Sequence, residues 1–349
     1  MVKNSNLHKA KNEKNDEFYT QLTDIEKELK HYKDQFKGKT IFCNCDDPDW
    51  SNFWAFFSLN FNHFGLKKLI STHYDASAPT YKMERTGMTD DDVKITPLRC
   101  NGDFRSDEAI NILMESDIVV TNPPFSLFRE YIAQLMNYEK NFLVIGSMNA
   151  ITYKEIFPSI KNNALWLGMT TGARAFILPK NAPEKSTDKI IDGKRCTVLG
   201  NTCWFTNITH SKRNQPIELY HTYRGHEENY PRYDNYDAIE VSKVKDIPCD
   251  YDGAMGVPIT FLEKYCPDQF EILGITAGRD EFECRPSKRY KNPVQHNANG
   301  STSNGSKANT RSTILIYRTP SGTYYTADNA DSKFLIVYAR ILIKTKQRS

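Results

Sequence analysis

Apolar residues in the first 150 positions follow two alternating patterns. Helical spacing, with apolar side chains three or four residues apart, predicts helices over 23–36, 52–64, 106–115 and 127–137. Thr23 and Glu26 have the spacing of a capping box at the start of the first helix. Short apolar runs predict strands over 40–44, 66–72, 94–100, 117–121 and 142–145. This alternation favours an α/β, Rossmann-like fold built on a mostly parallel sheet with both faces covered.

The pattern changes after residue 160. Shorter apolar runs separated by turns predict strands over 164–167, 173–178, 196–205 and 217–223, which we expect to form an antiparallel edge of the sheet. Further strands are predicted over 268–275 and 313–317, followed by an apolar run over 334–343. Segment 291–309 is rich in Asn, Gly and Ser, which predicts a mobile loop. We therefore divide the chain into a basic flexible arm (1–15), a first domain (16–221) and a second domain (222–349).

Composition places the chain among ordinary folded proteins. Of its 349 residues, 39% are apolar and 26% are charged, and no apolar run approaches the roughly 20 residues of a membrane helix. The polar N-terminal segment has no signal-peptide character, so we expect a cytoplasmic protein with eight reduced cysteines. Cys43 and Cys45 lie one residue apart, and no other Cys or His pair has zinc-ligand spacing. We therefore expect buried core thiols and no metal site.

Basic residues are concentrated in two segments. The net charge of +3 is small, but segment 281–312 alone carries +4 and the arm carries +3. Basic clusters attract phosphate backbones, whereas the simpler interpretation is a solvated loop and a frayed terminus. We single out Arg285, Lys288, Arg289 and Lys291 as candidate nucleic-acid contacts.

The strongest chemical signal is the run Asn122-Pro123-Pro124-Phe125, which directly follows the predicted strand 117–121. In open α/β sheets, ligands bind just beyond the carboxyl ends of the strands. Two prolines stiffen the loop and fix its carbonyl groups, while Asn122 adds an acceptor and Phe125 adds a flat apolar face. Such a corner suits a planar exocyclic amine, whose N–H groups two acceptors can hold while Phe125 stacks on the ring. The simpler alternative is a tight turn stiffened by proline.

The chain also resembles a known family. Asn-Pro-Pro-Phe matches the signature of S-adenosylmethionine-dependent amino-methyltransferases. The closer resemblance is to the EcoRI-type adenine-N6 DNA methyltransferases. It rests on LHKAK and DEFYTQ at 7–21, CNCDDP at 43–48, SNF at 51–53, GLKKLI at 65–70, SDIVVTNPPFSLFREYIAQL at 116–135, NAITYKEIFP at 149–158, and YPRYDNYDAI with DGAMGVPITF at 230–261. These stretches span most of residues 7–275, and the last 75 residues or so are not matched.

The resemblance implies roles for particular residues. It implies that S-adenosylmethionine is held by residues at the start of the sheet and after its first strands: Tyr19, Thr20, Asn44, Asp46, Asp47, Asp75, Asp103 and Phe104. The loop after the first strand lacks the glycines that the wider family has there, so Asp46 or Asp47 is expected to contact the cofactor's ammonium or ribose instead. Alternative interpretations are a turn cap for Asp75 and a helix cap for Asp103. Trp204 and Phe205, with Phe125, are implied to lie near the target base, although both are equally compatible with a core position.

Together these residues predict a site-specific DNA adenine-N6 methyltransferase of the restriction-modification type. Asn122, Pro123, Pro124 and Phe125 would hold a flipped-out adenine for in-line methyl transfer, and residues 222–349 would form a target-recognition domain on double-stranded DNA. We expect a monomer, with a restriction endonuclease as its functional counterpart. Two alternatives stay open: methylation of RNA or of a protein glutamine by the same motif, and a catalytically inactive nucleic-acid-binding module.

Overall fold

The computed structural model describes residues 19–75, 79–178, 182–276 and 284–346. These residues fall into two compact units, the first made of residues up to 150 together with 165–210, the second of 151–164 together with the residues from 211 onward. Within the described ranges, no helix is both long and apolar enough to cross a membrane. The predicted basic arm, residues 1–15, lies outside the described residues.

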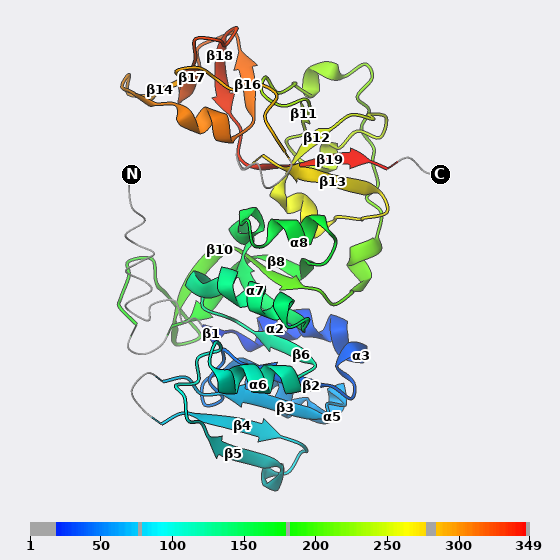
Figure 1. Cartoon of the computed structure of the whole chain (residues 1–349), viewed down its shortest axis with the longest axis vertical. Helices are drawn as coiled ribbons and strands as arrows, with labels where there is room; N and C mark the ends of the chain where they lie inside the picture. Colours follow the sequence, from blue (N-terminus) through cyan, green and yellow to red (C-terminus); the bar gives the residue numbers. More distant parts are fainter. Residues whose placement is uncertain (1–18, 76–78, 179–181, 277–283, 347–349) are drawn as a thin grey trace. The chain divides into compact units, whose positions relative to one another are not determined.

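The first unit is built on a ten-stranded sheet (Figure 1). Its strands are β1 Tyr19–Thr20, β2 Thr40–Cys43, β3 Lys68–Thr72, β4 Tyr81–Arg85, β5 Val93–Pro97, β6 Ile118–Thr121, β7 Asn141–Ser147, β8 Trp166–Ile177, β9 Lys189–Ile191 and β10 Lys194–Thr206. They lie in the order β1-β8-β10-β7-β6-β2-β3-β4-β5, with β9 paired to β10. The central strands β7, β6, β2 and β3 are parallel, as predicted, and antiparallel strands continue the sheet at both edges.

Helices cover both faces of this sheet. They are α2 Leu22–Leu29, α3 Lys33–Phe36, α4 Asn52–Leu59, α5 Phe61–Phe64, α6 Asp107–Glu115 and α7 Phe128–Asn137. Helices α2 to α5 pack on one face in an aromatic core that includes the predicted stripe Phe53, Phe57, Phe61 and Phe64. On the other face, α6 contacts β2 and α7 contacts β7 (Figure 1). Burial on both faces explains why β2 and β6 are uninterrupted runs of buried residues.

The chain reverses direction across the sheet at β2, because β3 lies on one side of it and β6 on the other. Such a switch point leaves a crevice at the carboxyl ends of the two strands, where α/β proteins bind their ligands. The segment after β2 begins at Asn44 and the segment after β6 begins at Asn122. The fold therefore places two of the predicted site segments at the same edge of the sheet.

Several predicted elements of the first unit were wrong in detail. Helix α2 begins at Leu22, with Gln21 as N-cap and no side-chain cap, so Thr23 and Glu26 form no capping box. The predicted helix 52–64 is divided at Asn60. Strand β5 pairs antiparallel with the unpredicted strand β4, so it is an edge strand and not a parallel one. The two strands predicted over 164–178 form the single strand β8.

The second unit contains helix α8, Phe157–Lys161, and two smaller sheets. The four-stranded sheet has the order β11-β12-β19-β13, with β11 Ile239–Glu240, β12 Met255–Pro258, β13 Phe270–Ile275 and β19 Arg340–Thr345. The five-stranded sheet has the order β15-β14-β17-β18-β16, with β14 Val294–His296, β15 Thr302–Asn304, β16 Thr313–Ile316, β17 Tyr324–Thr326 and β18 Lys333–Ile336.

Three predictions for this unit were also wrong. Segment 217–223, which the structure describes in full, forms no strand and makes only a bridge between His221 and Pro248. Segment 291–309 is not a structureless loop, because it forms the β14–β15 hairpin and a 3-10 helix over Ser306–Thr310. The apolar run 334–343 is divided between β18 and β19, which belong to different sheets.

Candidate active site

Strand β6 ends at Thr121 and leads directly into the corner Asn122-Pro123-Pro124-Phe125. Asn122 and Pro123 are buried, whereas Phe125 is half-buried and begins a short 3-10 helix over Phe125–Leu127. The Leu127 amide donates to the Pro124 carbonyl at 3.0 Å, which closes the turn before α7 begins. The Phe125 ring packs edge-to-face on Phe176, with a centroid distance of 6.2 Å. The corner is therefore held rigidly between the strand and the helix.

A buried carboxylate ties this corner to the segment after β2. Asp46 is 7% exposed. Its Oδ2 atom accepts hydrogen bonds from the Thr121 hydroxyl and, at 3.2 Å, from the Asn122 backbone amide. Its Oδ1 atom accepts from the Ser51 hydroxyl at 3.0 Å. Burial raises the pKa of Asp46 to about 7, although these donors act in the opposite direction by stabilising its charged form.

A second link joins Asn44 to helix α7. The Tyr131 hydroxyl donates to Oδ1 of Asn44, which fixes the orientation of that amide. The ring of Tyr131 also packs edge-to-face on Phe104, at a centroid distance of 5.0 Å. Asn44 is 4% exposed, and among the described residues its Nδ2 atom has no hydrogen-bond partner. One tyrosine thus orients two of the predicted cofactor residues and leaves a buried donor available.

The segments after β3 and β5 approach each other closely. The Asp75 amide donates to the Asn101 carbonyl at 3.2 Å. Gly102 has a φ of +77°, and a Cβ atom there would lie 2.3 Å from the carbonyl oxygen of His73. Only glycine fits this position, because it has both the permitted φ and the missing side chain. His73 in turn pairs through Nδ1 with Oδ2 of Asp47 at 2.7 Å.

Asp103 and Phe104 come directly after Gly102 in the sequence. Both carboxylate oxygens of Asp103 accept from the Arg105 guanidinium, at 2.9 and 2.7 Å, and this ion pair lowers the pKa of Asp103. Phe104 is buried. The N-cap of α6 is Ser106, whose hydroxyl accepts from the Ala109 amide at 3.2 Å. The alternative interpretation of Asp103 as that helix cap is therefore wrong.

Tyr19 and Thr20 form the short strand β1, which pairs with the end of β8. The Thr20 carbonyl accepts from the Asn52 side-chain amide at 2.6 Å, which ties β1 to the start of α4. Thr20 is 3% exposed. Its hydroxyl is buried and, within the part of the chain that the structure describes, has no hydrogen-bond partner.

Comparison with known proteins identifies the family to which the chain belongs. A family model described as adenine-specific methyltransferase EcoRI matches residues 6–346. The chain belongs to this family. It is similar to the Type II methyltransferase M.EcoRI of Escherichia coli, with 46% identity over 297 residues that cover 80% of this chain and 91% of the relative. It is also similar to the Type II methyltransferases M.MgeORF184P of Mycoplasma genitalium and M.MpnI of Mycoplasma pneumoniae, with 42% and 40% identity over 276 residues, 78% of this chain and 86% of each relative. No solved structure matches the chain.

This family assignment makes the protein a DNA adenine methyltransferase, as the sequence predicted. The structure of the methyltransferase brings some of the predicted site residues into contact and places others in the hydrophobic core. Asn122 and Asp46 are joined by a hydrogen bond, and Asn44 and Phe104 both contact Tyr131. Trp204 and Phe205 differ, because both are 0% exposed in strand β10 and pack on Phe53 and Phe128. The structure therefore favours core positions for Trp204 and Phe205 over positions near the target base.

Sequence reasoning missed several residues that hold the candidate site together. They are Ser51, Ser71, His73, Tyr131 and the hydroxyl group of Thr121. A signal existed for two of them, because Ser71 and Thr121 are polar residues that directly follow the apolar runs of β3 and β6, and the Ser71 hydroxyl bonds the carbonyls of Cys43 and Asp46. Tyr131 gave no such signal, since it occupies an ordinary core-facing position of α7.

The predicted DNA-contacting residues lie in the second unit of the methyltransferase and are not equivalent. Arg285, Arg289 and Lys291 are exposed. Lys288 is less accessible and forms a salt bridge with Asp234, with its Nζ atom 3.0 Å from Oδ2. Its charge is therefore partly neutralised within the protein.

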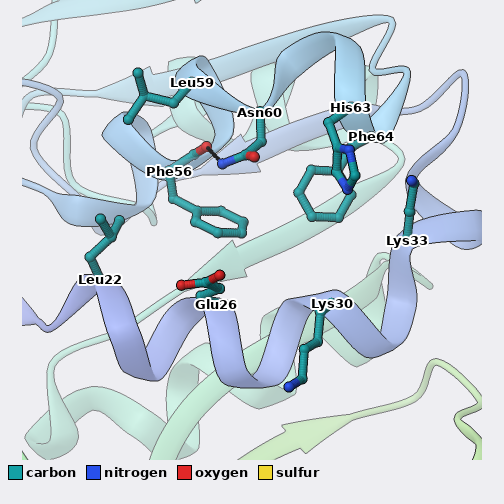
Figure 2. A pocket seen from close by; sticks show the side chains of 9 residues that line it. All are labelled: Leu22, Glu26, Lys30, Lys33, Phe56, Leu59, Asn60, His63 and Phe64. Carbon is teal, nitrogen blue, oxygen red and sulfur yellow. Dashed lines mark hydrogen bonds between the residues drawn. The ribbon is translucent and has the colours of Figure 1, made fainter.

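A pocket of about 230 Å³ lies elsewhere on the first unit, between α2 and the helices α4 and α5 (Figure 2). Glu26 and Phe56 point toward each other across it, and Asn60 donates to the Phe56 carbonyl at 2.9 Å (Figure 2). Lys30 and Lys33 also line it. These lining residues are different from the predicted site residues, so the pocket is separate from the corner after β6.

Proposed function

We propose that this protein is a site-specific DNA adenine-N6 methyltransferase that uses S-adenosylmethionine and acts at the corner after β6. The observation that carries the proposal is the hydrogen bond between the Asn122 amide and Asp46. It joins the catalytic motif to the cofactor-side loop at the switch point of the sheet, where α/β proteins bind ligands.

The chemistry of the surrounding side chains fits S-adenosylmethionine. The buried Nδ2 atom of Asn44 and the buried hydroxyl of Thr20, neither of which has a hydrogen-bond partner among the described residues, suit the polar amino-acid end of the cofactor. Tyr19, which precedes Thr20 in strand β1, is assigned to the same end. Asp47 and Asp75 offer carboxylates for an ammonium group and ribose hydroxyls, and Asp103 with Phe104 offers an acceptor and a ring for adenine. When bound, the cofactor supplies an electrophilic methyl group on its sulfonium.

The target adenine is held by the corner itself. The side-chain carbonyl of Asn122 and the backbone carbonyl of Pro123 accept the two N–H groups of the exocyclic amine, and Pro124 keeps the turn stiff. Phe125 offers its ring face to the base. Because adenine cannot reach this corner inside the helical stack, it must be flipped out of the duplex, which costs a few kcal/mol.

The second domain is proposed to recognise the target sequence in the DNA. Residues 16–221 form the catalytic domain and residues 222–349 the target-recognition domain, with Arg285, Lys288, Arg289 and Lys291 on the phosphates. The basic arm 1–15 adds backbone contacts. The protein works as a monomer, since an asymmetric reader needs no twofold partner. The names of the relatives describe Type II methyltransferases, which supports a restriction endonuclease as its functional counterpart.

The experiment measures transfer of a labelled methyl group from S-adenosylmethionine to duplex DNA, RNA or protein. We expect N6-methyladenine in duplex DNA from the parent protein and none from Asn122→Ala, with cofactor affinity changed by less than about twofold. Met114→Ala, at an exposed position on α6, is the matched control. Full activity of Asn122→Ala would refute the assigned site. Label in RNA or protein alone, or failure of the parent to bind the cofactor, would support the alternatives.

A further inference from the structure

Asp46 forms hydrogen bonds with several elements around the candidate site. Its side chain bonds Ser51, which is the N-cap of α4, and it bonds both Thr121 and Asn122 at the end of β6. Its backbone carbonyl accepts from the Ser71 hydroxyl of β3. The residue therefore ties three elements, β3, α4 and the catalytic corner, to the end of β2.

The hydrogen-bonding capacity of the carboxylate is already largely used inside the protein. The Oδ2 atom accepts two donors and Oδ1 accepts one, and the residue is 7% exposed. A carboxylate oxygen accepts about two hydrogen bonds, so only one acceptor position remains, on Oδ1, and it belongs to a side chain that is almost fully enclosed by the protein. Asp47, the next residue, differs because it is less buried and bonds His73.

We propose that Asp46 is a positioning residue for methyl transfer, which holds the Thr121–Asn122 backbone in place and does not bind the cofactor. This inference rests on the proposed role of Asn122. The Asp46 bond reaches the backbone nitrogen of Asn122, one bond from the carbon that carries its amide side chain. Loss of the bond frees the corner to move, and a displacement of about 1 Å can lower a rate about 100-fold.

The test separates the two roles of Asp46 by kcat and by cofactor affinity. Asp46→Ala should lower kcat about 10- to 100-fold while the Kd for S-adenosylmethionine changes less than about twofold. Asp46→Asn keeps an acceptor for the Asn122 amide, so it should restore kcat to within about fivefold of the parent. Asp49→Asn, in the same loop but exposed, is the control.

Two results would overturn the inference. One is a Kd for S-adenosylmethionine raised tenfold or more in Asp46→Asn with kcat unchanged at saturation, which would make Asp46 a cofactor ligand. The other is parental kcat in Asp46→Ala while Asn122→Ala is inactive, which would leave the proposed function standing. If Asp46→Ala does not fold, Thr121→Val removes one donor to the same oxygen and should still lower kcat severalfold without changing Kd. An unchanged kcat in Thr121→Val would then count against the inference.

Discussion

The hydroxyl of Tyr131 on helix α7 donates a hydrogen bond to the side-chain oxygen of Asn44 after strand β2. The helix that follows the corner 122–125 therefore determines which way a predicted cofactor residue presents its amide. The same ring supports Phe104, so the aromatic body and the hydroxyl of Tyr131 have separable effects.

We predict that Tyr131→Phe weakens cofactor binding by about 3- to 30-fold, because the Asn44 amide loses the bond that orients it while the ring contact with Phe104 remains. The value of kcat at saturating cofactor should stay near that of the parent. Tyr131→Leu should weaken binding further, because it removes both contacts. Calorimetric titration with S-adenosylmethionine measures each Kd, and equal affinity in Tyr131→Phe and the parent would contradict this account.

The raised pKa of Asp46 predicts a pH-dependent stability. The folded protein holds this proton more tightly than the unfolded chain does, so the contribution of Asp46 is fully present below pH 4 and is lost as the pH rises through about 7. The loss is at most about 1.4 kcal/mol per pH unit. Asp46→Asn cannot titrate, so its free energy of unfolding relative to the parent should rise between pH 5 and pH 8.

Urea unfolding at several pH values measures this difference. The groups facing Asp46 that can ionise are Cys43, Cys45, Asp47 and Tyr131, and His73 pairs with Asp47. All of them are present in both proteins and largely cancel in the comparison. Parallel stability curves for the two proteins would show that Asp46 does not titrate in this window.

Gly102→Ala should destabilise the first unit by more than about 1 kcal/mol, because it combines an unfavourable φ with a clash against the His73 carbonyl. We expect cofactor binding to weaken as well, since Asp103 and Phe104 follow directly. Gly38→Ala is a matched control, because Gly38 has a φ of +71° and nothing within 4 Å of its added Cβ. Thermal unfolding of both variants checks this, and equal effects would mean that the close approach to His73 is unimportant.

The exposed cations of the second unit should contribute to DNA binding through phosphate contacts. If Arg285, Arg289 and Lys291 each contact one phosphate, their joint replacement by Gln lowers the slope of log K against log salt by about 2.7. Lys288→Gln should change this slope less and lower stability more, because Lys288 pairs with Asp234. Fluorescence anisotropy at several salt concentrations measures both, and an unchanged slope in the triple variant would indicate a solvated loop.

The parallel centre of the sheet was predictable because its strands are short apolar runs flanked by helices, and the corner at Asn122 was predictable from its position after one of them. Strand β4 was not predictable, since its sequence YKMER is half-buried at every position and contains only two apolar residues, Tyr81 and Met83, among three charged ones. Segment 291–309 was missed for a related reason, because polar strands such as β15 carry no burial pattern. The bonds of Asp46 and Tyr131 join residues about 75 to 90 positions apart and could not be read from local spacing.

Strand β19, Arg340–Thr345, lies between β12 and β13 and pairs with both. Those two strands are synthesised some 65 residues or more before it, and they cannot join into one sheet until it arrives. A polypeptide that ends before residue 340 would thus carry every residue of the corner 122–125 and yet lack the strand that unites the four-stranded sheet of its second unit. Premature termination would therefore leave the second unit without its uniting strand, although the whole of the first unit, which ends at residue 210, would already have been synthesised.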